Sequence, residues 1–331
     1  MKIAFFDTKP YDERFFNEIL NEYNFKIKYF ENKLNEDTVS LAKGYDVVCV
    51  FVNDTLNKAV IDTLHDGGTE LIAMRCAGYN NVDFEASHGK VHVVRVPAYS
   101  PYAVAEHAAA LMVTLNRKTH RAYNRTRESN FNINGLLGFD LHGKTLGVIG
   151  TGKIGQILCN IGKGYGMRVL SYDKFPNKSL NLEYTDLDTL YKESDVISLH
   201  CPLLIETHHM INKESMNKMK DGVMLINTSR GGLVDAESLI EAIKTRKIGS
   251  AGLDVYEEES DYFFEDFSDE IITDDILARL LSFNNVLVTS HQAFFTKEAL
   301  SNIAKTTLDN IKAFARKEEL VNEICSICGK K

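Results

Sequence analysis

The feature that most constrains the fold is a regular alternation of short apolar runs with amphipathic segments. Apolar runs of strand length, rich in β-branched and aromatic residues, occupy 2–7, 25–30, 45–51, 70–76 and 91–96. Between them, segments such as 12–23 and 57–66 place apolar residues at helical spacing. This order predicts a parallel β-sheet with helices on both of its faces.

A second series of the same kind follows a longer connecting segment. Residues 102–129 contain no glycine or proline, and Ser100 and Pro101 before them suit the start of a helix. We therefore expect one long helix that leads out of the first domain. Further apolar runs occupy 144–150, 167–173, 195–202, 222–231, 250–256 and 285–291. The acidic segment 257–275 is expected to be a surface excursion, and 296–316 a final amphipathic helix.

Length and composition bound the class of protein. A chain of 331 residues is long enough for two domains, and 44% hydrophobic with 25% charged residues is usual for a globular protein. The net charge of −8 argues against nonspecific nucleic-acid binding. The N-terminal apolar run is too short for a signal peptide or a membrane span, so we expect a cytoplasmic protein with no membrane partner.

The six cysteines are scattered along the chain and are expected to be free thiols. Cys325 and Cys328 have the spacing of a metal or redox pair, but no second ligand pair accompanies them. We expect no metal site.

A glycine-rich loop with a downstream acid indicates dinucleotide binding. Gly150, Gly152 and Gly155 form a G-x-G-x-x-G pattern directly after an apolar run and at the start of a helical segment. In this context the glycines allow a tight turn, close approach of a pyrophosphate and close packing of helix on strand. The next apolar run ends at Asp173, where an acid can bind the ribose hydroxyls and repel a 2′-phosphate. The pattern favours NAD over NADP.

Charged side chains follow the later apolar runs. Arg230 lies at the end of one run, Asp254 lies within the next and Glu259 beyond it, and His291 ends the last. Because ligands bind outside the carboxyl ends of parallel strands, these groups should share one edge of the sheet. Arginine can pair with a substrate carboxylate, and histidine can exchange the hydroxyl proton during oxidation of a 2-hydroxy acid. A carboxylate bonded to that imidazole stabilises its protonated form.

Together these motifs resemble the D-isomer-specific 2-hydroxyacid dehydrogenase family, and within it the NAD-dependent D-lactate branch. The match covers essentially the whole chain, with motifs in family order at 75–83, 96–108, 147–155, 199–203, 227–235, 252–259 and 290–296. Many members have proline before and threonine after the histidine; here Ser290 and Gln292 stand there, and the glutamine is also found in the bacterial D-lactate branch.

The resemblance implies a role for each matching residue. Arg230 would bind substrate, Glu259 would be the carboxylate partner, and His291 the acid and base. The cofactor contacts would include Gly150, Gly152, Lys153, Ile154, Gly155, Asp173, Cys201, Pro202, Thr207, Thr228, Ser229, Arg230 and Asp254. In the first domain, the backbone N–H groups of Ala77 and Gly78 would hold the substrate carboxylate, and Tyr99 would close over it.

The resemblance also implies an architecture of two Rossmann-like or flavodoxin-like doubly wound domains. The NAD domain, 101–298, would be inserted into a discontinuous substrate domain, 1–100 with 299–331. Family members are usually homodimers built around the helix after Pro101, sometimes assembled into tetramers.

Pyruvate, reduced to D-lactate, is the substrate that the resemblance favours. Aromatic residues such as Tyr79, Tyr99, Phe294 and Phe295 would narrow the pocket toward it. A larger 2-oxo acid, such as 2-oxoisocaproate or phenylpyruvate, would use the same charged residues. A remoter alternative is an NADH-sensing binding module on the same fold.

Overall fold

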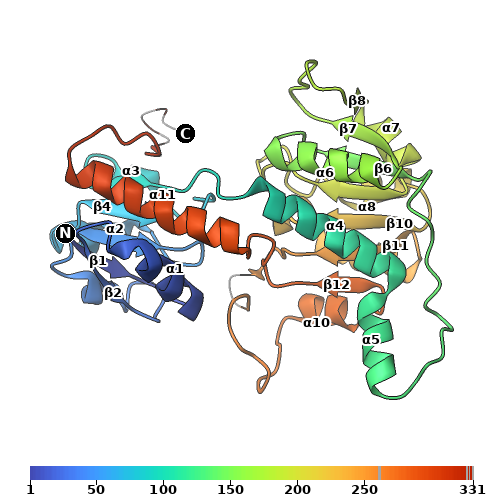
Figure 1. The fold of residues 1–331 in the computed structure, drawn as a ribbon, viewed down its shortest axis with the longest axis horizontal. Coiled ribbons are helices and arrows are strands. Elements are labelled where there is room, and N and C mark those ends of the chain that lie inside the picture. Colours follow the sequence, from blue (N-terminus) through green and yellow to red (C-terminus); the bar gives the residue numbers. More distant parts are fainter. Residues whose placement is uncertain (260–261, 326, 328, 330–331) are drawn as a thin grey trace. The chain divides into compact units, whose positions relative to one another are not determined.

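The computed structural model describes residues 1–259, 262–325, 327 and 329. By its internal contacts the chain divides into unit 1, Met1–Ser100 with Phe295–Lys331, and unit 2, Pro101–Phe294 (Figure 1). Each unit is built on one parallel sheet, as the alternation predicts. The resemblance implies that residues 295–298 belong to the inserted domain, whereas by their internal contacts they belong to unit 1.

Unit 1 has a five-stranded sheet in the order β2-β1-β3-β4-β5. Its strands are β1 (Lys2–Phe5), β2 (Lys26–Tyr29), β3 (Val47–Val50), β4 (Leu71–Met74) and β5 (His92–Val94). Its helices are α1 (Pro10–Leu20), the 3₁₀ turn η1 (Val39–Ala42), α2 (Lys58–Asp66), α3 (Phe84–Ser87) and α11 (Lys297–Ala315). β3 and β4 are buried along their whole length, which explains their continuous apolar sequence.

The last helix, α11, belongs to unit 1. Thr296 caps α11 by accepting a hydrogen bond from Ala299 N at 3.2 Å. α11 packs against α1 and β4, and the Tyr23 hydroxyl donates to Asp309 at 2.7 Å. α11 is therefore part of the same packed unit as the first hundred residues.

Unit 2 has a seven-stranded sheet in the order β12-β11-β10-β9-β6-β7-β8. Its strands are β6 (Thr145–Ile149), β7 (Arg168–Tyr172), β8 (Glu183–Tyr184), β9 (Val196–Leu199), β10 (Val223–Asn227), β11 (Ile248–Leu253) and β12 (Val286–Val288). Its helices are α4 (Pro101–Arg117), α5 (Thr119–Arg127), α6 (Lys153–Gly164), α7 (Leu187–Glu193), α8 (Lys213–Lys218), the 3₁₀ turn η2 (Gly231–Leu233), α9 (Ala236–Lys244) and α10 (Asp275–Ser282).

Hydrophobic clusters cover both faces of this sheet. On one face, α4 and α6 bury side chains such as Leu111 and Leu158. On the other, α7, α9 and α10 bury Leu190, Leu239 and Leu277. The helices cover the two faces of the sheet but not the carboxyl ends of its strands. The loops at this edge carry polar side chains.

The expectation of one long helix over 100–129 is wrong. α4 ends at Arg117, Lys118 adopts a left-handed conformation with φ 49°, and α5 begins at Thr119. The Asn116 side chain exchanges two hydrogen bonds of 2.8 Å with the backbone of Phe139. These contacts with a distant segment anchor the end of α4, and a local sequence pattern does not reveal them.

The acidic segment is more than a surface excursion. Phe263 of this segment is buried in the core of unit 2, and Asp274 accepts a hydrogen bond at 2.7 Å from the hydroxyl of Tyr256, which precedes the segment. Aromatic side chains in this segment therefore attach it to the domain.

Four cysteines, Cys49, Cys76, Cys159 and Cys201, are free thiols, as expected. Cys325 is disulfide-bonded, so the expectation is wrong there, and Cys328 lies outside the described residues. Among the described helices, none combines the length and the apolar character needed to cross a membrane.

Candidate active site

The glycine loop joins β6 to α6 in a geometry that demands glycine. Gly150 has φ +95°, and a Cβ there would lie 2.5 Å from the carbonyl oxygen of His200. A Cβ on Gly155 would lie 1.9 Å from the carbonyl oxygen of Gly150. At Gly152, by contrast, a Cβ would meet no atom within 4 Å, so there is free space next to the backbone at the start of α6. The loop therefore leaves space beside the first N–H groups of α6, at Lys153 and Ile154, where a pyrophosphate fits.

Asp173 follows β7 at the same edge of the sheet. Its carboxylate accepts hydrogen bonds from the backbone N–H groups of Thr151 (2.7 Å) and Phe175 (2.9 Å). Partial burial opposes ionisation, but these hydrogen bonds outweigh it and hold the pKa of the Asp173 carboxyl below its usual value. The neighbouring Lys174 pairs with Glu206 at 2.6 Å. Asp173 is thus a negative charge next to the glycine loop.

Further residues predicted to contact the cofactor lie after β9 and β10. The Ser229 hydroxyl donates to the Cys201 carbonyl at 2.6 Å, and the Thr207 hydroxyl donates to the Pro202 carbonyl at 2.8 Å. The Thr228 hydroxyl oxygen is buried and has no hydrogen-bond partner among the described residues. An unpaired buried hydroxyl costs stability unless a ligand satisfies it, so Thr228 fits a site for a polar cofactor.

His200 follows β9 and lies against the loop at Gly150. Burial of its side chain should make the free energy of unfolding depend on pH. Burial lowers the pKa of its imidazole to about 4, below the roughly 6.5 of an unfolded chain. Between pH ~4 and ~6.5 the unfolded chain therefore binds more protons at His200 than the folded chain does. The contribution of neutral His200 to the free energy of unfolding is fully present above pH ~6.5 and is lost as the pH falls toward ~4.

We expect His200→Asn to reduce this acid sensitivity by at most about 3 kcal/mol. Urea unfolding of native and variant protein at pH 7 and pH 4.5, followed by circular dichroism, measures the difference. Equal losses in the two proteins would show that His200 does not contribute.

Arg230 lies just beyond β10. Its guanidinium donates to the Ser229 carbonyl at 2.7 Å, while its own carbonyl accepts from Asn227 at 2.8 Å. Among the described residues, no carboxylate forms an ion pair with it. A partly buried arginine without an anionic partner is suited to bind a carboxylate ligand.

His291 and Glu259 form a hydrogen-bonded pair. His291 Nδ1 lies 2.7 Å from Glu259 Oε1, and both side chains are 19% exposed. The other carboxylate oxygen, Oε2, accepts from the backbone N–H of Tyr256 at 2.9 Å, which fixes its orientation. This contact occupies Nδ1 and leaves Nε2 of His291 as the nitrogen for a substrate.

Asp254 organises the loop that carries His291. Its wholly buried carboxylate accepts from the Thr289 hydroxyl and from the backbone N–H groups of Gln292 (3.0 Å) and Ala293 (2.9 Å). The Asp254 carbonyl accepts from His291 N at 2.7 Å, and His291 has φ 50°. His107 Nε2 also contacts the Asp254 carboxylate at 3.2 Å. Sequence reasoning missed these supporting contacts, which join positions far apart in the chain.

The sheet order brings these groups to one edge. β10, β11 and β12 are neighbours, so Arg230, the Asp254–Glu259 segment and His291 follow adjacent strands. β6 and β7, which carry the glycine loop and Asp173, belong to the same sheet.

The remaining predicted residues lie in unit 1. The Ala77 carbonyl accepts from Arg95 at 2.9 Å, and the Tyr99 carbonyl accepts from Asn302 at 2.7 Å. The backbone N–H groups of Ala77 and Gly78 donate to no group among the described residues. They remain available to an anion.

Comparison with known proteins agrees with this arrangement. Residues 109–293 match the family described as D-isomer specific 2-hydroxyacid dehydrogenase, NAD binding domain. The chain belongs to this family. It is 55% identical to a 2-hydroxyacid dehydrogenase homolog of Haemophilus influenzae over 94% of the chain and 95% of that protein. It is 50% identical to the D-lactate dehydrogenase of Escherichia coli over 98% of the chain and all (100%) of that protein.

A solved structure supports the fold assignment. The apo-structure of D-lactate dehydrogenase from Escherichia coli matches with a TM-score of 0.90 at 48% identity, covering 98% of this chain and 100% of that one. As a member of the D-isomer-specific 2-hydroxyacid dehydrogenases, the protein is an NAD-dependent oxidoreductase.

Proposed function

We propose that this dehydrogenase reduces pyruvate to D-lactate, reversibly, with NADH. The observation that supports the proposal best is the 2.7 Å contact between His291 and Glu259, at the sheet edge where Arg230 has no carboxylate partner among the described residues. An anion-binding arginine and a histidine with a carboxylate partner match the two polar ends of a 2-oxo acid. The identity to a D-lactate dehydrogenase over the whole chain favours pyruvate among such acids.

Each residue has a defined task in this proposal. Arg230 pairs with the substrate carboxylate and polarises the adjacent carbonyl. Protonated His291 gives its proton to the carbonyl oxygen during reduction and takes it back during oxidation, while Glu259 stabilises the imidazolium. The bound nicotinamide cofactor supplies or accepts the hydride. Ala77 and Gly78 offer their N–H groups to the carboxylate, and Tyr99 contacts the substrate.

Turnover of purified protein with NADH and a panel of 2-oxo acids tests this function. We expect the highest kcat/KM for pyruvate, with lower values for 2-oxoisocaproate and phenylpyruvate, and a product that a chiral assay identifies as D-lactate. A higher kcat/KM for a larger acid would move the assignment to that substrate.

Cofactor preference is expected to depend on Asp173. The ionised carboxylate should repel a 2′-phosphate, so NADH should exceed NADPH in kcat/KM by at least about tenfold, or roughly 1.4 kcal/mol. Asp173→Asn should narrow this ratio, whereas Asp188→Asn, at an exposed acid of α7, should leave it unchanged. Equal kcat/KM for both cofactors in the native protein would contradict the role of Asp173.

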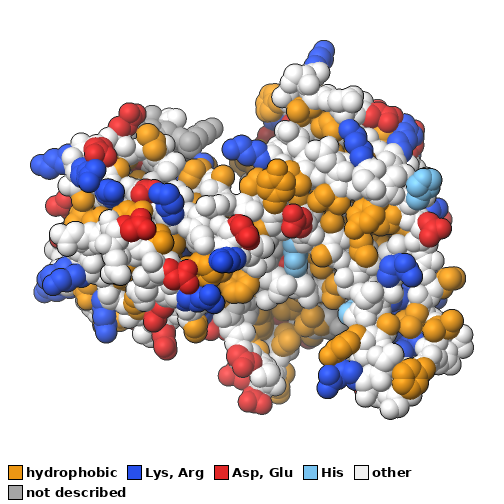
Figure 2. All heavy atoms as spheres, in the orientation of Figure 1, with side chains coloured by type: hydrophobic (Ala, Val, Ile, Leu, Met, Phe, Trp, Pro, Cys, Tyr) orange, Lys and Arg blue, Asp and Glu red, His pale blue; other side chains and the backbone are white. Residues whose placement is uncertain are grey.

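We also propose that the protein is a homodimer through α5 and the segment that follows it. Figure 2 shows hydrophobic side chains gathered on the surface at α5, and exposed apolar residues here include Tyr123 (59%), Phe131 (76%), Ile133 (78%) and Leu137 (87%). Such a cluster is costly in water and is typical of an interface. Sedimentation velocity should give a dimer, and Ile133→Asp with Leu137→Asp should give a monomer. Ile271→Asp, at an equally exposed residue, should remain dimeric.

A cytoplasmic location completes the proposal. Four cysteines, Cys49, Cys76, Cys159 and Cys201, are free thiols, as is typical of a reducing compartment, and only Cys325 among the described cysteines is disulfide-bonded.

A further inference from the structure

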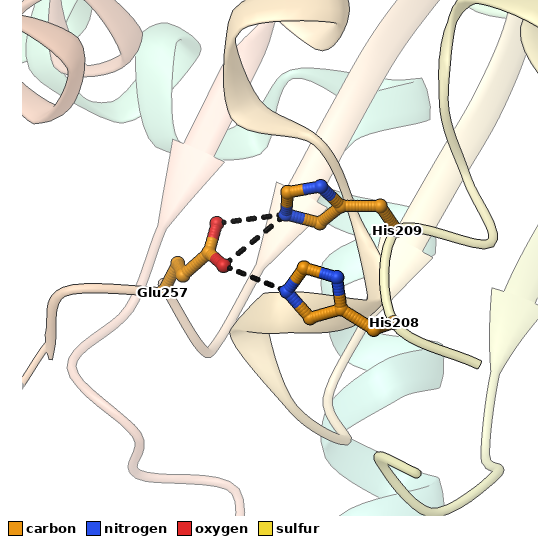
Figure 3. Close-up of side chains that lie close together, drawn as sticks. All are labelled: His208, His209 and Glu257. Atoms are coloured by element: carbon orange, nitrogen blue, oxygen red, sulfur yellow. Dashed lines mark hydrogen bonds and ion pairs between the residues drawn. The ribbon is translucent and has the colours of Figure 1, made fainter. Parts of the chain in front are cut away.

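Two consecutive histidines and a glutamate form a cluster in unit 2 that the dehydrogenase chemistry does not use. His208 and His209 lie in the loop between β9 and α8, and Glu257 lies beyond β11. Figure 3 shows both imidazole rings directed at the Glu257 carboxylate. One ligand atom from each residue lies within 4.8 Å of the other two.

The backbone of the loop explains how neighbouring residues can direct their rings the same way. His209 has φ 48°, a left-handed conformation that non-glycine residues seldom adopt. Its N–H donates to the Gly232 carbonyl at 2.8 Å, and its carbonyl accepts from Asn212 at 2.9 Å. The rings consequently stack, with centroids 3.9 Å apart and planes inclined by 25°. The arrangement is held by the fold before any ligand binds.

The distances suit a metal ion. Nε2 of His208 lies 3.3 Å from Glu257 Oε1, and Nε2 of His209 lies 3.1 Å from the same oxygen and 3.0 Å from Oε2. Ligand atoms of a tetrahedral zinc site lie about 3.3 Å apart, because each is about 2.0–2.1 Å from the metal. Small side-chain rotations would let an ion replace the protons that now link these atoms.

The chemical types and exposure also fit. Two imidazoles and one carboxylate form a zinc ligand set that leaves a fourth position for water. Imidazole nitrogen selects Zn²⁺ and Cu²⁺ over Mg²⁺ or Ca²⁺, which prefer oxygen ligands. The side chains of His208, His209 and Glu257 are 51%, 35% and 33% exposed, so an ion in solution can reach them.

The cluster joins two segments that border the candidate active site. The loop of His208 and His209 also carries Thr207, and Glu257 lies in the segment that leads to Glu259. A Cβ on Gly231, the residue after Arg230, would lie 2.4 Å from Glu257 N, so the Glu257 backbone passes directly against this turn. We propose that His208, His209 and Glu257 bind Zn²⁺, which links the β9–α8 loop to the segment after β11.

Zinc binding is tested on the metal-stripped, full-length protein by competition with a chromogenic chelator. We expect one tight equivalent of Zn²⁺ in the native protein, and at least about tenfold weaker binding in His209→Asn and in Glu257→Gln. His65→Asn, an exposed histidine of α2, serves as the matched control and should bind as the native protein does. Unchanged affinity in both cluster variants would overturn the proposal.

Two further measurements locate the ion. Cu²⁺ bound at the same site should show hyperfine coupling to two imidazole nitrogens by electron paramagnetic resonance, reduced to one in His208→Asn. Hydrogen exchange should slow in residues 203–212 and 255–259 when Zn²⁺ is added. Protection confined to residues 288–294 would place the ion at His291 instead and contradict the assignment.

Discussion

Arg230→Lys is expected to lower kcat/KM for pyruvate by about 10²–10³-fold, the usual cost of removing a donor aimed at developing charge. Lysine keeps the positive charge but loses the planar fork that binds a carboxylate through two parallel hydrogen bonds. Because no carboxylate among the described residues pairs with Arg230, the substitution should leave no unpaired acid behind. The effect should therefore appear in turnover rather than in folding.

NADH binding separates this role from a structural one. The chain has no tryptophan, so the fluorescence of NADH itself reports binding without interference from that residue. We expect Arg230→Lys to bind NADH nearly as the native protein does, and Arg279→Lys, at an arginine of α10, to keep native turnover. Near-normal kcat/KM in Arg230→Lys would show that the arginine is structural.

The sequence predicted on which edge of the sheet Arg230 lies, because all strands of a parallel sheet end at the same edge. Each apolar run is a strand, each strand ends at the same edge, and the polar residue that follows is therefore placed without knowledge of packing. Arg230, Glu259, His291 and Asp173 all follow this rule. The glycine loop was equally predictable, since its contacts lie within one strand–turn–helix unit apart from the approach of His200.

What the sequence could not provide depends on contacts between distant segments. Lys118 interrupts the long helix although no glycine or proline is present, and Asn116 holds that break through Phe139. Asp254 positions His291 through hydrogen bonds to a loop far along the chain. His208 and His209 meet Glu257 in the same way, which is why spacing alone indicated no metal ligands. Tertiary packing determines all of these, and local periodicity carries no information about them.

His291→Ala should lower turnover in both directions by about 10²–10⁴-fold, the usual contribution of general acid–base catalysis. Glu259→Gln tests the coupling between the paired side chains, because it keeps the shape of the carboxylate but removes its charge. Without that charge the imidazolium gives up its proton more readily. Pyruvate reduction requires protonated His291, so its kcat/KM should decline at a lower pH in Glu259→Gln than in the native enzyme.

The direction of the shift distinguishes this coupling from a structural role of Glu259. Lactate oxidation requires neutral His291, so its rising limb should also move to lower pH, and this direction should lose less activity than reduction. A variant that had merely loosened the segment at Tyr256 would lose activity at every pH without moving either limb. Glu265→Gln, at an exposed acid of the same segment, should leave both limbs in place. If the reduction limb of Glu259→Gln stays where it is or moves to higher pH, then Glu259 does not stabilise the protonated imidazole, and the 2.7 Å contact only orients the ring.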